Sequence, residues 1–219
     1  MDSIDLYCER TGPGLWAEPL NAVTNVAFIV AALFLWRFAW NSRRLDIQVR
    51  VLLCLMVSLG VGSGLFHTIP NSLTIVLDEL PIAFTVLHIA WLYCRRIIGL
   101  SAIVSGGILA AAMFGAYTGM QIPYVLNGSL MYVTVLILVA SLGMVHRLQD
   151  RREPYSFLAA AGVFVVALFF RTIDNATCSV FPLGTHFMWH ILDAIALYLA
   201  TLALLVNLPA DSNNSRSAA

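Results

Sequence analysis

The sequence predicts an all-α membrane protein with seven transmembrane helices. Its 219 residues are 60% hydrophobic and only 11% charged, whereas a soluble domain carries about 25% charged residues. The mean hydropathy of +0.84 points to the same class. The apolar residues also fall into seven separate runs, most of them close to the length of about 20 residues that a helix needs to cross the hydrocarbon core of a bilayer.

The seven runs follow one another with short polar connections. Arginines come directly after the third and fifth runs and soon after the first, and a proline-containing turn separates the second from the third. The sixth run is the shortest, but the aliphatic stem of Arg171 can extend it while the guanidinium reaches the interface. We therefore expect helices at Asn21–Trp40, Val49–Phe66, Ile75–Cys94, Ile98–Gly115, Pro123–His146, Phe157–Phe170 and His186–Val206.

The chain contains no segment that resembles a linker or a second domain. We expect residues 1–209 to form one seven-helix domain, and the polar residues 210–219 to be a disordered tail. The formal net charge is zero, so nothing in the bulk charge indicates a nucleic-acid partner. The sequence gives no indication of the oligomeric state.

The positions of the arginines predict the orientation in the membrane, because cytoplasmic connections carry an excess of basic residues. The connections after the second and fourth helices contain no basic residue, and the one after the sixth contains only Arg171. The N-terminus is therefore predicted to lie outside and the C-terminus in the cytoplasm. The cytoplasmic arginines are Arg37, Arg43, Arg44, Arg50, Arg95, Arg96, Arg147, Arg151 and Arg152.

The four cysteines divide between the two sides. Cys8 and Cys178 fall in segments predicted to lie outside, whereas Cys54 and Cys94 fall near cytoplasmic helix ends. An oxidising compartment allows a disulfide, which would tie the N-terminal segment to the connection between the sixth and seventh helices. Two free, small apolar side chains are the alternative.

Polar residues from three helices are predicted to meet at the outer side of the membrane. His186 and His190 are four residues apart, so they share one face of the seventh helix. His67 ends the second helix, Ser63 shares its face, and Asp78 lies in the first turns of the third helix. Three histidines and a carboxylate at one depth fit a catalytic zinc site, since such sites use three protein ligands and leave a position for water.

Each residue has a candidate role and a simpler alternative. Asp78 can orient the water and accept its proton, or only favour the start of a helix. Ser63 can donate a hydrogen bond to the water or to the oxyanion, or only satisfy a backbone carbonyl. Asp193, one turn deeper than His190, can accept the second N–H of a ligand histidine, or bond to another helix. The histidines themselves can also be interfacial polar residues.

The N-terminal segment is rich in acidic residues. Asp5, Glu9 and Glu18 lie outside in the predicted topology. Calcium prefers oxygen ligands from carboxylates and carbonyls, so a second, structural cation is one interpretation of this segment. A solvated acidic face is the other.

Taken together, these motifs resemble the alkaline ceramidase family, which belongs to a superfamily of seven-helix membrane hydrolases that includes the adiponectin-type receptors. The similarity covers nearly the whole chain. It rests on Ser63-x3-His67, on Asp78 within Leu-Asp-Glu-Leu-Pro, and on His186-x3-His190 with Trp189. It also includes Tyr7-Cys8-Glu9, Trp16 with Glu18, Asn21-x3-Asn25, and Ile173-Asp174-Asn175-x2-Cys178.

The resemblance implies zinc held by His67, His186 and His190, with Asp78 and Ser63 in the catalytic group. It implies hydrolysis of the amide of ceramide or a related N-acyl lipid, which yields a free fatty acid and a sphingoid base or amine. It also implies a disulfide between Cys8 and Cys178, and a calcium site to which Glu9 and Glu18 correspond. At that site the sequence departs from the family, with Leu6 in place of an acidic residue and Thr11 in place of an asparagine.

The short chain and tight connections look like those of a bacterial member. The expected location is then the inner membrane, with the active site on the periplasmic side. A seven-helix receptor with a mainly structural zinc site is an alternative function. A transporter is disfavoured, because transport needs polar residues along the whole path and the inner halves of the helices carry few beyond His88 and Asp193.

Overall fold

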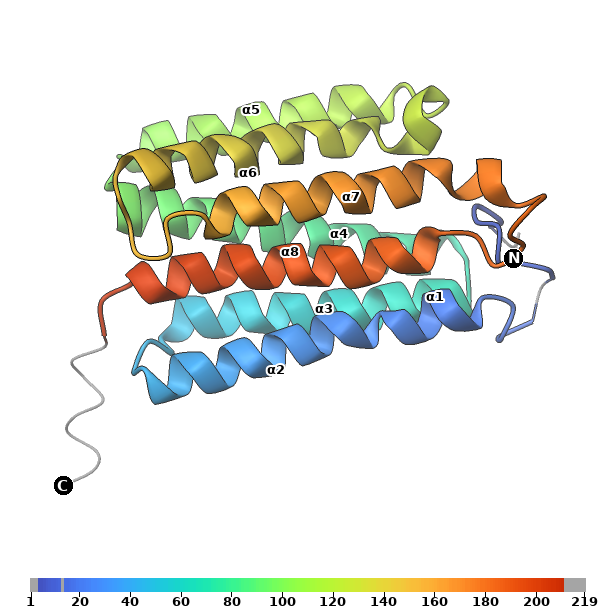
Figure 1. Ribbon diagram of the computed structural model, residues 1–219, viewed down its shortest axis with the longest axis horizontal. Coiled ribbons are helices and arrows are strands. Elements are labelled where there is room, and N and C mark those ends of the chain that lie inside the picture. The colour runs from blue at the N-terminus through green and yellow to red at the C-terminus, as the bar shows by residue number, and fades with distance from the viewer. Residues whose placement is uncertain (1–3, 13, 211–219) are drawn as a thin grey trace.

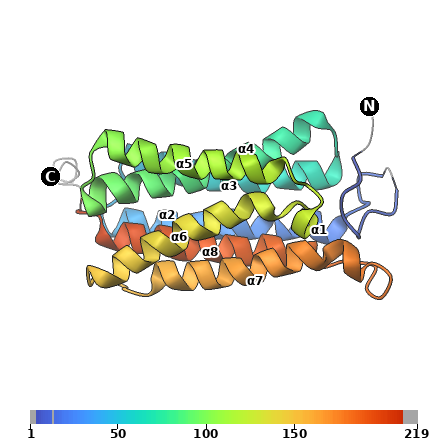
Figure 2. The same cartoon turned by 90° about the horizontal axis from the view of Figure 1, so that it is seen from above.

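A computed structural model describes residues 4–12 and 14–210 and shows a bundle of helices running along one long axis (Figures 1 and 2). Within these residues, seven helical stretches are long and apolar enough to span a membrane, and no strand occurs. The predicted fold class is therefore confirmed, and the chain is an integral, multi-pass membrane protein. The predicted tail lies outside the described residues from residue 211 onward.

The first span consists of a short and a long helix, and the third ends in a π-helical turn at Tyr93–Ile98. The helices are α1 Pro19–Thr24, α2 Val26–Asn41, α3 Ile47–Thr68, α4 Ser72–Leu92, α5 Ala102–Met120, α6 Leu130–Leu148, α7 Ser156–Thr177 and α8 His186–Asn207.

Three predicted helices had boundaries that were wrong by several residues. α5 runs from Ala102 to Met120 rather than from Ile98 to Gly115, because Gly99 has a positive φ of 84° and ends the preceding span, and Ser101 then caps the new helix. α7 continues to Thr177 rather than ending at Phe170, because Asp174 turns its side chain into the protein and is fully buried there. α6 begins at Leu130 rather than Pro123, because Leu126, Asn127 and Gly128 all have positive φ values of 53°, 52° and 74°. Three consecutive left-handed residues cannot belong to a right-handed helix.

Several helices begin at a residue whose side chain caps them. Asp46 accepts a hydrogen bond from the backbone N–H of Val49 at the start of α3. Asn71 and Thr74 form a reciprocal capping box at the start of α4. Such caps satisfy backbone donors that the first turn of a helix leaves without a partner; the cap of α4 lies at the histidine end of the bundle and that of α3 at the opposite end.

α8 is the most buried span of the bundle. It lies between α7 and α2 and also contacts α1 and α4 (Figure 1). α5 and α6 pack together at the side away from α2. Because α8 carries two of the histidines, these two side chains start from the best-enclosed helix of the described bundle.

α3 and α4 approach each other closely at Gly62. A Cβ atom at this position would lie 1.9 Å from the carbonyl oxygen of Leu77, far inside van der Waals contact. Small residues allow this kind of approach between membrane helices. The contact brings Ser63, the residue after Gly62, to the level of Asp78, the residue after Leu77.

The arginine-rich connections all lie at the end of the bundle opposite the histidines. Arg96 forms an ion pair with Asp46 at 2.5 Å, which joins two of these connections. Arg44 donates to the carbonyl oxygen of Leu208 at 2.8 Å, beside the end of α8. The two ends of the bundle therefore differ in chemistry, one basic and the other built around histidines and buried carboxylates.

Candidate metal centre

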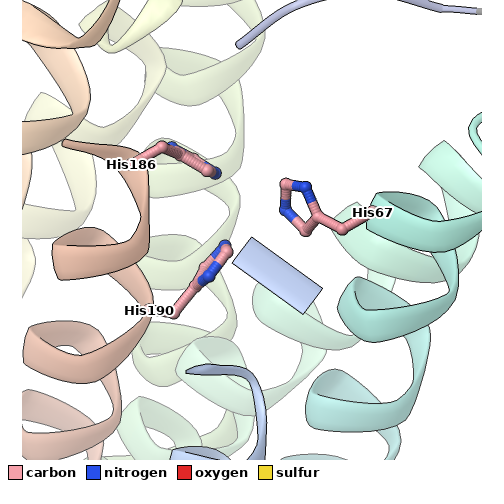
Figure 3. Close-up of side chains that lie close together, drawn as sticks. All are labelled: His67, His186 and His190. Carbon is pink, nitrogen blue, oxygen red and sulfur yellow. The ribbon is translucent and has the colours of Figure 1, made fainter. Parts of the chain in front are cut away.

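The three predicted histidine ligands converge at one end of the bundle. His67 projects from α3, and His186 and His190 project from successive turns of α8 toward it (Figure 3). All three are buried, with exposed fractions of 0–2%. One nitrogen from each ring lies within 4.8 Å of the other two, a geometry that could hold a metal ion.

Glu18 sets the tautomer of His67. Its Oε2 atom lies 2.5 Å from Nδ1 of His67, and an ionised carboxylate can only accept a hydrogen bond. Nδ1 of His67 therefore carries the proton, and Nε2 presents a lone pair. Nε2 is buried and has no hydrogen-bond partner among the described residues, so its lone pair is available to a metal ion. A carboxylate behind a metal-binding histidine is a common arrangement.

Arg10 and Asn21 complete the surroundings of Glu18. Nε of Arg10 donates to Oε1 at 2.5 Å, and Nδ2 of Asn21 donates to Oε2 at 3.1 Å. Burial acts to raise the pKa of Glu18, but the bond to His67, the bond to Asn21 and the charge of Arg10 hold that pKa below its usual range. Glu18 is therefore a buried carboxylate, paired with a buried guanidinium.

Thr24 performs the corresponding role for His190. Its hydroxyl lies 2.7 Å from the carbonyl oxygen of Leu20, to which it donates, and 3.0 Å from Nδ1 of His190. Since the single hydroxyl proton is used toward Leu20, the oxygen accepts the N–H of His190. The lone pair of His190 is thereby left on Nε2.

The backbone and ring of His186 are held by two different groups. Asp174 accepts hydrogen bonds from the backbone N–H groups of Thr185 and His186, at 2.6 Å and 2.9 Å, and so supports the start of α8. The ring of Tyr7 stacks on the imidazole of His186 with centroids 3.6 Å apart. Nδ1 of His186 is buried and has no partner among the described residues.

A disulfide joins Cys8 to Cys178 across 170 residues of sequence. The same Asp174 also accepts the backbone N–H of Cys8 at 3.0 Å. The covalent link and this hydrogen bond hold the N-terminal segment on the histidine end of the bundle. Tyr7 is thus held against His186 by its neighbour in the chain.

A small polar cavity lies beside the histidines. Ser63 and Asp78 line it together with His186 and His190, so the structure brings the predicted catalytic residues to the predicted ligands. Arg171 also lies in its wall. Its Nη1 donates to the carbonyl oxygen of Asn127 and to Oγ of Ser129, and no carboxylate forms an ion pair with it within the described part of the chain.

A larger apolar cavity continues from the polar one toward the middle of the bundle. The two share Ile82 and Tyr132 in their walls, and the apolar one lies between α4, α6, α7 and α8. The chain thus places an apolar space directly next to a polar site.

Asp193 lines this apolar cavity instead of bonding to a histidine. The expected hydrogen bond to a ligand histidine is not observed, because Nδ1 of His190 already bonds to Thr24 and that of His67 to Glu18. The residues that bond to the histidine rings come from segment 18–24. The spacing of residues within α8 could not indicate these contacts.

The predicted calcium site is not supported. Both oxygens of Glu9 accept backbone N–H groups, from Leu20 at 2.7 Å and Asn21 at 2.8 Å. Glu18 is surrounded by donors, and the positive charge beside it is the guanidinium of Arg10. Asp5 is exposed and takes no part in this cluster. The acidic residues are therefore used by the protein itself, because a buried cationic side chain and backbone amides satisfy them.

Comparisons with known proteins agree with this arrangement. The family model described as Ceramidase matches residues 7–217, nearly the whole chain. The match includes the N-terminal segment as well as every span. No curated protein and no solved structure matches the chain.

Proposed function

This chain belongs to the ceramidase family, and on that premise we propose that it is a zinc-dependent intramembrane amidase. It hydrolyses ceramide or a related N-acyl lipid to a free fatty acid and a sphingoid base or amine. The observation that carries the proposal is the convergence of buried ring nitrogens, two of them without partners, beside a carboxylate and an apolar cavity.

The residues that hold the zinc are His67, His186 and His190. Neutral imidazole nitrogens in a group of three are a common ligand set of catalytic zinc sites, and the bonds from Glu18 and Thr24 leave two of these rings in the required tautomer. When bound, zinc supplies a Lewis acid that lowers the pKa of a water molecule to about 7 and polarises a carbonyl.

Asp78 acts as the general base and then as the general acid. It lies in the wall of the polar cavity, where it accepts a proton from the attacking water and transfers it to the departing amine nitrogen. Ser63 donates a hydrogen bond to the carbonyl oxygen of the amide. The charge of Arg171, in the same wall, favours the negative charge that develops on that oxygen.

The apolar cavity receives the acyl chain. Among the residues that line it, Ile82, Tyr132 and Phe164 lie near the polar end, and Leu142, Phe157 and Ala160 lie deeper. An alkyl chain placed there leaves its carboxyl end at the polar cavity, next to Asp78. The adjoining walls thus present an amide bond to the histidines while its apolar part stays out of water.

The site faces the outside of the cell in this proposal. The arginine-rich connections lie at the end of the bundle away from the histidines, and basic connections remain in the cytoplasm. In a bacterium this places the protein in the inner membrane with the site toward the periplasm. This orientation is tested by introducing single cysteines and labelling intact cells with a membrane-impermeant reagent. A cysteine at position 124 should be labelled, and one at position 150 should be protected.

The function is tested by incubating the purified protein with a panel of N-acyl lipids and measuring the release of fatty acid. Asp78→Asn is expected to retain zinc and to lose activity by about 10²- to 10⁴-fold, the usual contribution of a general acid–base residue. Glu79→Gln is the matched control, because Glu79 lines a neighbouring apolar pocket instead of the polar cavity. Undiminished turnover in Asp78→Asn would contradict the role of Asp78 as the general base, and zinc binding without hydrolysis of any lipid by the wild type would favour a receptor with a structural metal.

A further inference from the structure

Asp193 is an acidic residue in an apolar wall. Its exposed fraction is 4%, and it has neither a hydrogen bond nor an ion pair to any described residue. Apart from the hydroxyl-bearing Tyr132, the other residues that line the cavity are aliphatic, alanine or phenylalanine. A buried polar group without a partner is strongly unfavourable, so its presence in a ligand cavity indicates that the ligand supplies the partner.

The depth of Asp193 defines where on a ligand that partner lies. Asp193 is three residues beyond His190 on α8, which places it about 4.5 Å farther along the helix axis at 1.5 Å per residue. An extended carbon chain advances about 1.2 Å per bond. A chain whose carbonyl carbon lies at the histidines therefore passes Asp193 within about four bonds.

We propose that Asp193 is a specificity-determining residue that accepts a hydrogen bond from a hydroxyl group on the acyl chain. The hydroxyl lies on a carbon within about four bonds of the carbonyl carbon, so the preferred substrates are amides of fatty acids hydroxylated between carbons 2 and 5, and the 3-hydroxy amides represent this class in the test. This inference rests on the proposed amidase function and specifies its substrate class. An unsubstituted chain would bury the same carboxyl group against methylene groups.

The test uses amides that share one amine and one chain length and differ only in the acyl hydroxyl. With the purified, zinc-loaded protein, kcat/KM for the 3-hydroxyacyl amide is expected to exceed that for the unsubstituted amide by about 10- to 100-fold, as a hydrogen bond to a charged group allows. Asp193→Leu is expected to remove this preference by raising the rate on the unsubstituted amide and lowering that on the hydroxylated one. Asp193→Asn, which keeps an acceptor, should retain part of it.

Two further measurements distinguish a change in substrate specificity from a loss of folding or of catalysis. The thermal unfolding midpoint of Asp193→Leu should not fall below that of the wild type, because the variant removes an unpartnered buried acid. Binding of the free fatty acids, measured as a shift of that midpoint, should favour the 3-hydroxy acid in the wild type and lose this preference in Asp193→Leu.

The outcomes separate the two proposals. Selective binding of the hydroxy acid without hydrolysis of any amide would leave the role of Asp193 standing and contradict the amidase function. Hydrolysis without a hydroxyl preference would overturn the role of Asp193 and leave the amidase function intact. An equal loss of activity on all substrates in Asp193→Leu, or a preference set only by hydroxyls on the amine, would also overturn it.

Discussion

Replacing Glu18 with glutamine is expected to weaken zinc binding although Glu18 is not a ligand. Its carboxylate accepts Nδ1–H of His67 at 2.5 Å, and it also accepts Nε–H of Arg10 and Nδ2–H of Asn21. A glutamine keeps one oxygen and replaces the other with an N–H₂ donor. At least one of the three donors then faces another donor, and the orientation of the His67 ring is no longer held.

The magnitude follows from the two interactions that are lost. Losing the group that supports a metal-binding histidine lowers metal affinity by about 10- to 100-fold, or about 1.4–2.8 kcal/mol. Breaking a buried ion pair from one side lowers the free energy of unfolding by about 3–5 kcal/mol. The affinity and stability effects therefore have to be measured separately.

Competition with a chelator of known zinc affinity gives the dissociation constant, and thermal unfolding in detergent gives the stability. Glu9→Gln is the matched control. Glu9 is equally buried but bonds only to backbone N–H groups, from Leu20 and Asn21. The Glu9→Gln substitution should therefore lower the free energy of unfolding and leave the zinc dissociation constant unchanged. Equal zinc affinity in the wild type and Glu18→Gln, at full folding, would refute the assigned role of Glu18.

Three further predictions follow from contacts around the site. Thr24→Val removes the acceptor of the His190 N–H and should lower zinc affinity by about tenfold; an unchanged affinity in chelator competition would contradict the assigned tautomer. Gly62→Ala should abolish activity and destabilise the protein, because its Cβ would lie 1.9 Å from a carbonyl oxygen of α4, whereas Gly64→Ala, with its nearest atom at 3.8 Å, should be tolerated in both assays. Cys8→Ser should lower the free energy of unfolding by about 2–5 kcal/mol, and reductant should then have no further effect on the unfolding midpoint.

The fold and the meeting of the histidines could be predicted because both depend on local patterns. A run of apolar residues must form a helix that spans the membrane, and a spacing of four places His186 and His190 on one face. Knowing which helix ends lie on one side of the membrane was enough to bring His67 and Asp78 to the same depth. The structure places all four at that end.

The partners of these residues could not be predicted in the same way. Glu18 and Thr24 reach the histidines because α1, the first part of the first span, packs against α3 and α8, in contacts between residues 49 and 166 positions apart. Arg10 reaches Glu18 because the N-terminal segment folds back on itself. No periodicity in the sequence indicates that its guanidinium occupies the position where a calcium ion was expected. The spacing of Asp193 from His190 suggests a residue that supports a histidine, but its side chain lies in the wall of the apolar cavity.

The central claim is tested most directly by measuring zinc content and amide hydrolysis on the same purified protein. The wild type is expected to contain one zinc ion per chain and to release fatty acid from at least one N-acyl lipid. His190→Ala should lose both stoichiometric zinc and hydrolysis while remaining folded. Normal turnover by protein free of bound metal would contradict the proposed mechanism.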